Sequence, residues 1–249
     1  MLSKSKIKLI TSLSQKKFRD ETGLFIAEGT KLVSDLATTF LCSILIATSD
    51  WYSNHTIKSL DTIEIEDAEF KKISNQKSSQ GVLAVFEKPQ YSFDKQELNQ
   101  QLSLALDNVQ DPGNLGTIIR IADWFGIKNI FCSEHSADVF NPKTVQATMG
   151  SLARVRVHAV NLADFLRNCP PELVVYGTVM DGKNIYHKTL SANGIIVMGN
   201  EGNGISPEIE KLISERLLIP NFPEGQPTSE SLNVGVATAL VCAEFRRRM

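Results

Sequence analysis

Short apolar runs alternate with helix-like segments through the second half of this 249-residue chain. Residues 102–109 and 129–133 have the length and composition of buried strands, and each is followed by a segment with apolar residues at helical spacing. Repeated strand–helix units of this kind predict a parallel sheet covered by helices on both faces, so the predicted fold class is α/β. Further strands are expected at residues 154–160, 173–180, 194–200 and 216–221, and helices at residues 116–127, 142–150, 162–168, 207–213 and 231–245.

The first half predicts a smaller α/β unit. Ile7, Ile10 and Leu13 recur at spacings of three within residues 4–15, which indicates a short amphipathic helix with its lysines outside. The polar stretch at residues 87–101 is the predicted linker, and a boundary near Gln96 gives domains at residues 1–95 and 96–249. A second helix is expected at residues 29–40, and strands at residues 24–29, 42–51, 61–67 and 80–88.

Composition excludes several classes of protein. Hydrophobic residues make up 42% of the chain and charged residues 22%, as in ordinary soluble proteins. No segment approaches the ~18 apolar residues of a membrane span, and the N-terminal residues lack the apolar run of a secretion signal. The cysteines stand far apart without histidines at ligand spacing, so we expect a cytoplasmic protein with reduced thiols and no metal. They are Cys42, Cys132, Cys169 and Cys242.

Charge is placed unevenly along the chain, although its net value is only −2. A run of basic residues precedes the first acid, Asp20, and Arg246 to Arg248 nearly close the chain. Such runs are usually solvated helix faces, but they also bind nucleic acids, and charge alone leaves both interpretations open. The first run consists of Lys4, Lys6, Lys8, Lys16, Lys17 and Arg19.

Ligands of open parallel sheets bind beyond the carboxyl ends of the strands, so the loops at those ends are the candidate site. The loop DNVQDPGNLG leads into an apolar helix that carries Arg120. Gly113 and Gly116 allow a tight turn, and Arg120 lies about one helical turn further on. A turn and a helix cap explain the glycines equally well, and Arg120 could pair with Asp123 or another acid. This loop alone leaves function and structure open.

Two further loops follow strands in the same way. GIIVMGNEGNGIS ends in closely spaced glycines, which let a ligand approach the backbone, and Glu201 is the unexpected residue among them. Its spacing is neither the dinucleotide fingerprint nor a phosphate loop. In SESLNVGVA, Ser229, Ser231 and Asn233 gather where a helix begins, which by itself is typical of an ordinary N-cap.

Together, LDNVQDPGNLGTIIR, VMGNEGNGIS and IPNF…SLNVGVATAL resemble the three motifs of the SpoU family of RNA ribose 2′-O-methyltransferases, in the SPOUT class. The resemblance covers residues 102–245 and implies a deep trefoil knot, an S-adenosylmethionine pocket and a homodimer formed through this domain. The implied cofactor contacts are Thr178, Gly199, Glu201, Gly204, Ile219 and Leu232. The implied catalytic residues are Asn114, Arg120, Glu201, Ser231 and Asn233.

The implied reaction is in-line transfer of a methyl group to a ribose 2′-hydroxyl, which must be deprotonated or polarised. Arg120 matches the family's proposed activator, but a free arginine side chain stays protonated up to a pH of at least ~12 and is therefore a poor base. We therefore expect Arg120 to clamp the adjoining RNA phosphate and orient the hydroxyl, with the phosphate or a transient arginine taking the proton. Two departures from the family pattern, a longer loop at residues 220–230 and Gly235 in place of a serine, remove no catalytic residue.

The first half, with EGTKLVSDLA after a strand, resembles the L30e-like substrate-binding domain of SpoU enzymes that act on ribosomal RNA. This resemblance rests on the order of elements and on Glu28, Gly29 and Lys31. It favours ribosomal RNA as the substrate over transfer RNA. A catalytically inactive RNA-binding assembly factor is the alternative from another class. A nicotinamide-binding oxidoreductase is a further interpretation from the fold alone, but the sequence lacks the dinucleotide-binding fingerprint that such an enzyme needs. The residues then expected to contact RNA phosphates are Lys4, Lys6, Lys16, Lys17 and Arg19.

Overall fold

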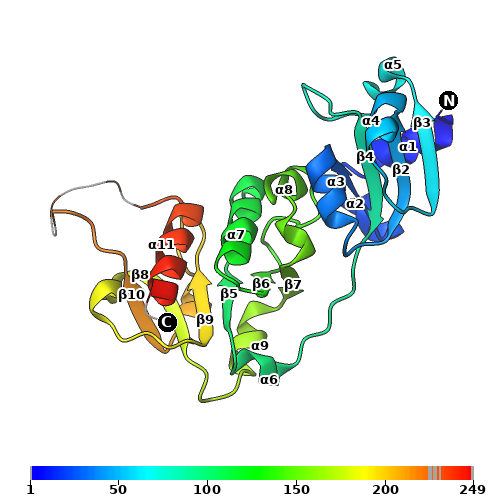
Figure 1. Ribbon diagram of the computed structural model, residues 1–249. Coiled ribbons are helices and arrows are strands. Elements are labelled where there is room, and N and C mark those ends of the chain that lie inside the picture. The colour runs from blue at the N-terminus through cyan, green and yellow to red at the C-terminus, as the bar shows by residue number, and fades with distance from the viewer. Residues whose placement is uncertain (1, 224–225, 227–228, 230, 248–249) are drawn as a thin grey trace. The chain divides into compact units, whose positions relative to one another are not determined.

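The computed structural model describes residues 2–223, 226, 229 and 231–247. The chain divides into two compact units (Figure 1). The first unit consists of Met1–Gln90 and Asp138–Arg154, and the second of Tyr91–Ala137 and Val155–Met249. The first unit is therefore built from two separate stretches of sequence.

A four-stranded mixed sheet forms the centre of the first unit, in the order β1-β4-β2-β3. Strand β4 runs antiparallel to β1 and β2, whereas β2 and β3 are parallel. The four predicted strands are confirmed, except that β2 ends early because the Thr48 side chain caps a helix, accepting from the Trp51 amide. The strands are β1 (Leu24–Glu28), β2 (Cys42–Thr48), β3 (Asp61–Ile65) and β4 (Val82–Glu87).

The helices of the first unit are short, and they come from both of its stretches of sequence. The amphipathic helix expected at the N-terminus is α1, which with the residue after it buries Ile10 and Leu13 against the sheet. Three helices were not predicted, because each is too short to show a clear period. These are α2 (Lys16–Thr22), α4 (Ser49–Asn54) and α5 (Asp67–Phe70); the others are α1 (Lys4–Ser12), α3 (Thr30–Leu36) and α8 (Pro142–Ala147).

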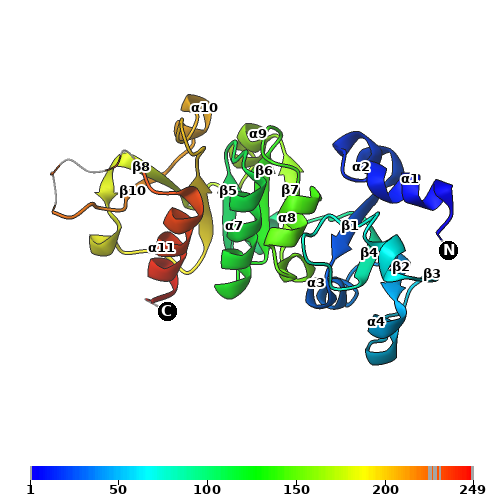
Figure 2. The same cartoon turned by 90° about the horizontal axis from the view of Figure 1, so that it is seen from above.

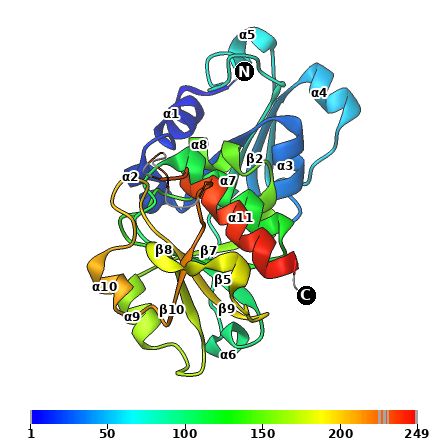
Figure 3. The same cartoon turned by 90° about the vertical axis from the view of Figure 1, so that its left-hand side faces the viewer.

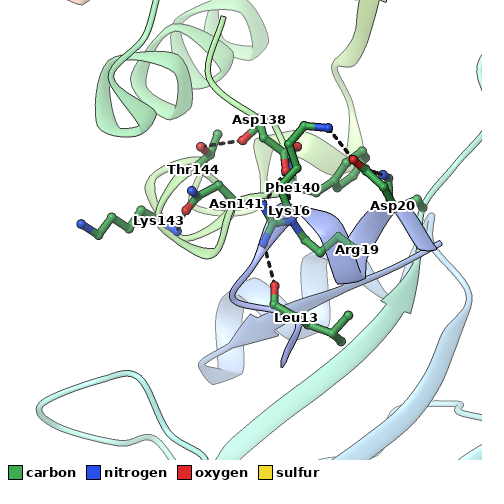
Figure 4. Close-up of polar contacts among 10 residues, drawn as sticks. Leu13, Lys16, Arg19, Asp20, Asp138, Phe140, Asn141, Lys143 and Thr144 are labelled. Atoms are coloured by element: carbon green, nitrogen blue, oxygen red, sulfur yellow. Dashed lines mark hydrogen bonds and ion pairs between the residues drawn. The ribbon is translucent and has the colours of Figure 1, made fainter. Parts of the chain in front are cut away.

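The stretch Asp138–Arg154 packs into the first unit through α8, which lies against β1. Phe140 is buried, with its ring 4.8 Å from that of Phe25. Arg19, 1% exposed, donates from Nε and Nη2 to Asp138 Oδ2 at 3.0 and 2.6 Å and from Nη1 to the Leu13 carbonyl at 2.7 Å (Figure 4). The expectation that Arg19 contacts RNA was wrong, because its side chain is buried and its guanidinium donates to Asp138 and to the Leu13 carbonyl.

A six-stranded sheet forms the second unit, in the order β10-β8-β9-β5-β6-β7. Every neighbouring pair is parallel, which confirms the predicted α/β fold with a parallel sheet. The central strands β5 and β9 are buried along their whole length, as the apolar runs predicted. The strands are β5 (Leu102–Leu106), β6 (Asn129–Ser133), β7 (Arg156–Val160), β8 (Val175–Asn184), β9 (Gly194–Met198) and β10 (Glu215–Leu218).

Helices cover both faces of this sheet (Figure 2). On one face α7 packs against α11, and on the other α9 packs against α10. Asp111 caps α7 by accepting from the Asn114 amide, and Pro112 occupies the first turn, where its missing N–H costs nothing. The helices are α6 (Lys95–Leu98), α7 (Pro112–Trp124), α9 (Leu162–Arg167), α10 (Pro207–Glu210) and α11 (Val234–Arg247).

The edge of this sheet at β8 and β10, which Figure 3 shows from its outer side, is irregular. Arg216 pairs with Gly177, but the next residue, Leu217, pairs with Lys183, so the intervening part of β8 bulges out. A Cβ at Gly182 would lie 2.5 Å from the backbone carbon of Leu217, which requires glycine where the two strands meet again. The bulge opens space beside the carboxyl end of β9.

Candidate functional site

One cavity of about 1140 Å³ lies at this edge of the second unit. Its lining combines the bulge of β8, the glycine-rich turn after β9, the segment after β10 and the residues before α11. All six residues expected to contact the cofactor lie around it, and Ser231 does too. The six are Thr178, Gly199, Glu201, Gly204, Ile219 and Leu232.

The glycine-rich turn at residues 199–204 folds back tightly on itself. A Cβ on Gly199 would lie 2.3 Å from the backbone carbon of Gly204, so only glycine fits there. Gly204 itself has φ 69°, in the left-handed region that glycine adopts freely. The backbone of the turn thereby forms one wall of the cavity.

Three of the predicted catalytic side chains form one hydrogen-bonded chain. Asn233 Nδ2 donates to Asn114 Oδ1 at 3.0 Å, and Asn114 Nδ2 donates to Glu201 Oε1 at 2.8 Å. These residues come from the loops before α11, at the start of α7 and after β9, so the three sequence motifs meet at one place.

Backbone amides fix which atom of each of these side chains donates and which accepts. Asn233 Oδ1 accepts from the amides of Gly235 and Val236 at 2.9 and 3.3 Å, so its Nδ2 must face Asn114. Asn114 must then receive with its oxygen and donate with its nitrogen, and Glu201 must accept, as a carboxylate does. Asn233 is thus both the N-cap that the sequence suggested and a member of the site.

Arg120 is exposed on α7. Within the part of the chain that the structure describes, Arg120 makes no hydrogen bond or ion pair, with Asp123 or with any other acid. It is not part of the cavity lining. The guanidinium therefore lies at the surface of the second unit.

Sequence reasoning missed a charged group in the cavity lining. Arg216 donates from Nη2 to Asp181 and to Glu210, the latter at 2.7 Å. The hydrogen bond from Arg216 lowers the pKa of the Asp181 carboxyl, and these bonds raise the pKa of Arg216. No motif signals this group, because its members come from β8, α10 and β10.

The predicted RNA-contacting lysines are at the surface of the first unit. Lys6 pairs with Asp61 at 2.5 Å, Lys16 with Asp20 at 2.5 Å and Lys17 with Glu21 at 3.8 Å. Lys4 is also exposed. Exposed ion pairs of this kind are weak.

Other features of the described residues bear on the site. No three histidine, cysteine, aspartate or glutamate side chains among them gather closely enough to hold a metal ion. None of the helices in the described part is long and apolar enough to cross a membrane. Of the long loop at residues 220–230, residues 224, 225, 227, 228 and 230 lie outside the described part, as does Arg248.

Comparisons with known proteins cover both halves of the chain. The model of the SpoU rRNA Methylase family matches residues 101–243, and that of the MRM3-like substrate binding domain matches residues 4–84. The 23S rRNA (guanosine(2553)-2′-O)-methyltransferase RlmP of Bacillus subtilis is 29% identical over 245 residues, covering 97% of this chain and 96% of its own.

Solved structures agree over the full length. A protein described as an RNA methyltransferase of the TrmH family from Porphyromonas gingivalis matches with a TM-score of 0.89 and 40% identity, over 100% of both chains. The AdoMet-bound rRNA methyltransferase of Sinorhizobium meliloti matches with a TM-score of 0.86 and 30% identity, over 100% of this chain and 97% of its own. This chain belongs to the SpoU rRNA methylase family, with an MRM3-like substrate-binding domain before the methylase domain.

Proposed function

We propose that this protein methylates a ribose 2′-hydroxyl in ribosomal RNA, with S-adenosylmethionine as the methyl donor. The observation that carries the proposal is the hydrogen-bonded chain Asn233–Asn114–Glu201, which joins the three family motifs at the rim of the cavity. Two relatives matched over nearly the whole chain, from Bacillus subtilis and Sinorhizobium meliloti, are named as rRNA methyltransferases, which favours ribosomal over transfer RNA.

The cavity fits the proposed cofactor in size and in chemistry. A volume of about 1140 Å³ accommodates a ligand of nucleoside size, for which pockets of about 300–1,000 Å³ are usual. The glycine-rich turn offers backbone groups around Gly199 and Gly204, and Ile219 and Leu232 offer apolar surface and backbone on the facing side. We propose these residues, with Thr178 at the rim, as the cofactor contacts.

The proposed mechanism relies on orientation. Bound S-adenosylmethionine supplies a methyl group made electrophilic by its sulfonium. Arg120 would clamp the RNA phosphate beside the target ribose with its planar fork of donors and so orient the 2′-hydroxyl. The hydroxyl proton would pass to that phosphate or transiently to Arg120, and loss of the methyl group would leave a neutral thioether. Asn114 and Asn233 hold Glu201 at the cavity rim, and Ser231 offers a hydroxyl there. Alignment of this kind contributes a large part of the rate of bimolecular transfers.

We propose that residues 1–95 bind the RNA and residues 96–249 carry the chemistry. The two matched family models, at residues 4–84 and 101–243, support this division. Asp138–Arg154 belongs to the catalytic part in sequence but packs within the first unit. Lys4, Lys6, Lys16 and Lys17 are the proposed phosphate contacts, which position RNA without selecting its sequence.

A homodimer is the proposed assembly. Trp124 on α7 is 85% exposed, and Val236 and Leu240 on α11 are 51% and 39% exposed. Arg120 lies one turn before Trp124 on the same face of α7. Exposed apolar side chains on two packed helices are typical of an interface, and a second copy there would bring a protein surface close to Arg120. We expect W124E to sediment as a monomer and L60E, which alters an exposed leucine of the first unit, to remain dimeric.

We also propose that the second unit is knotted and that the protein is cytoplasmic. The parallel pairing of β8 and β10 across a bulge, with Gly182 against Leu217, is consistent with the trefoil knot of this family, and single-molecule stretching should show a shortened contour length if it is present. The four free thiols fit a reducing compartment, so we propose the cytoplasm.

Ribose methylation mapped across total RNA from cells with and without this protein tests the proposal. We expect one or more 2′-O-methyl sites in ribosomal RNA to disappear with the protein. Loss of a transfer-RNA site instead would establish the alternative substrate. If no site disappears in either RNA, an assembly factor without catalysis becomes the better account.

A further inference from the structure

We propose that Asn200 is a positioning residue for the methyl transfer, because it fixes the glycine-rich turn and aims the Glu201 carboxylate. The proposal rests on the function proposed above and deepens it. Asn200 was not among the site residues predicted from the motifs. In the structure it lines the cavity as part of the glycine-rich turn.

Asn200 closes the turn on itself. Its backbone exchanges hydrogen bonds with Gly204, at 2.9 and 3.0 Å. Its side-chain Oδ1 accepts from the amides of Gly202 and Asn203, at 2.9 and 3.0 Å. Because backbone amides can only donate, Oδ1 must face the turn, and the Nδ2 donor must point away from it.

That donor reaches the backbone of the first motif. Asn200 Nδ2 donates to the Asn108 carbonyl at 2.7 Å. Asn108 has φ 58°, a left-handed conformation that asparagine adopts more readily than most other residues with a side chain. Ser133 holds it there, accepting from the Asn108 amide at 2.9 Å and lying 3.2 Å from its Oδ1.

Glu201 lies between the two anchored loops. Its Oε1 accepts from Asn114 at 2.8 Å, and its Oε2 lies 3.5 Å from Asn200 Nδ2. One oxygen is thus held by the chain of catalytic side chains and the other faces Asn200. Without the Asn200 donor, the turn loses its tie to Asn108 and the carboxylate loses one of its two orienting groups.

The variant N200D separates positioning from turn formation. It keeps the oxygen that accepts from Gly202 and Asn203 and replaces the donor by a second acceptor. The introduced carboxyl would face the Asn108 carbonyl and Glu201, and Asp107, which accepts from Asn108 Nδ2 at 3.0 Å, is the other acid of this network. The amides of Gly202 and Asn203 favour the charged form of the introduced group, whereas the Asn108 carbonyl and the nearby acids favour its protonated form, which restores a donor. We expect the second effect to prevail, so that the group takes up a proton at mildly acidic pH.

We expect kcat of N200D to be about 10²-fold below the wild type at pH 8, the order of loss that small misplacements cause, and the deficit to shrink at least about tenfold by pH 6. The KM for RNA should change by less than about threefold, because phosphate contacts are untouched. The control Q110E adds the same charge to an exposed position of the first motif and should keep the wild-type pH profile.

A pH profile of N200D parallel to that of the wild type would overturn the positioning role, as would a fall in kcat explained by thermal unfolding at the assay temperature. If the wild type itself methylates no RNA, the proposed function has failed, and calorimetry with S-adenosylmethionine then decides whether Asn200 fixes the glycine-rich turn that lines the cavity. In that case N200A should bind S-adenosylmethionine about tenfold more weakly than the wild type, by about 1.4 kcal/mol, and equal affinities would overturn the proposal.

Discussion

The buried ion pair between Arg19 and Asp138 makes a sharp prediction about the stability of the first unit. Arg19 is 1% exposed and the Asp138 side chain 14% exposed, so R19M leaves a nearly buried carboxylate without its counterion. Oδ2 loses both of its arginine donors, and among the described residues only the Phe140 amide, 3.0 Å from Oδ1, still donates to this side chain. Breaking a buried pair from one side costs about 3–5 kcal/mol, a large share of the 5–15 kcal/mol typical of a domain.

Thermal and urea unfolding measure this loss. At about 4 °C per kcal/mol for a unit of this size, the melting temperature of the first unit should fall by about 12–20 °C. K16M is the matched control on the same helix, because the Lys16–Asp20 pair is 66% and 45% exposed and should be worth less than about 1 kcal/mol. An R19M variant that melts within about 2 °C of the wild type would refute the reasoning.

R19M and K16M, together with K17M, also test whether Arg19 contacts RNA. At a temperature where all proteins are folded, affinity for RNA is measured as a function of salt concentration. Removing lysines that neutralise phosphates should flatten the salt dependence, whereas removing a buried arginine should not. We therefore expect K16M and K17M to reduce the slope and R19M to leave it unchanged; a flattened slope in R19M would return Arg19 to the RNA interface.

Three other predictions concern the second unit. R120K keeps the charge but loses the planar fork, so its methylation rate should fall at least about tenfold with the fold intact, and a near-normal rate would contradict the clamp. G199A places a Cβ 2.3 Å from backbone and should lower both the melting temperature and the affinity for S-adenosylmethionine, whereas G202A, whose Cβ meets only Asn200 Oδ1 at 3.6 Å, should melt like the wild type. Burial, aided by the charge of Arg156, lowers the pKa of His158. As the pH falls below ~6.5, the unfolded state therefore takes up the proton before the folded state does. The contribution of His158 to the free energy of unfolding should be complete above pH ~6.5 and decrease below it. H158F keeps the stacking on Phe131, and the difference between its urea-unfolding pH profile and that of the wild type isolates this effect; identical profiles would exclude it.

The tie between the polar linker and the second unit illustrates what the sequence concealed. Residues 87–101 were predicted as a linker from composition, but Tyr91 and Phe93 belong to the second unit, where their rings pack around His158 at 5.8 and 5.5 Å. Two aromatic residues in a polar stretch give no periodic signal, so only the packed structure reveals their role. Short helices such as α2 escaped prediction for the same reason.

The sequence by itself determined the parallel sheet, because buried strands and amphipathic helices have distinct apolar periods, and it determined the motif residues, because their spacing is specific to the family. Only the tertiary structure decided which polar groups are available. Arg19 and Arg120 are equivalent in charge, yet one is buried against Asp138, whereas the other is exposed and has no partner among the residues that the structure describes. Likewise, Asn200 became more than a turn residue only when folding brought the Asn108 carbonyl within 2.7 Å of its side chain. Burial and hydrogen-bond direction depend on contacts between residues about a hundred positions apart, and local sequence does not encode those contacts one by one.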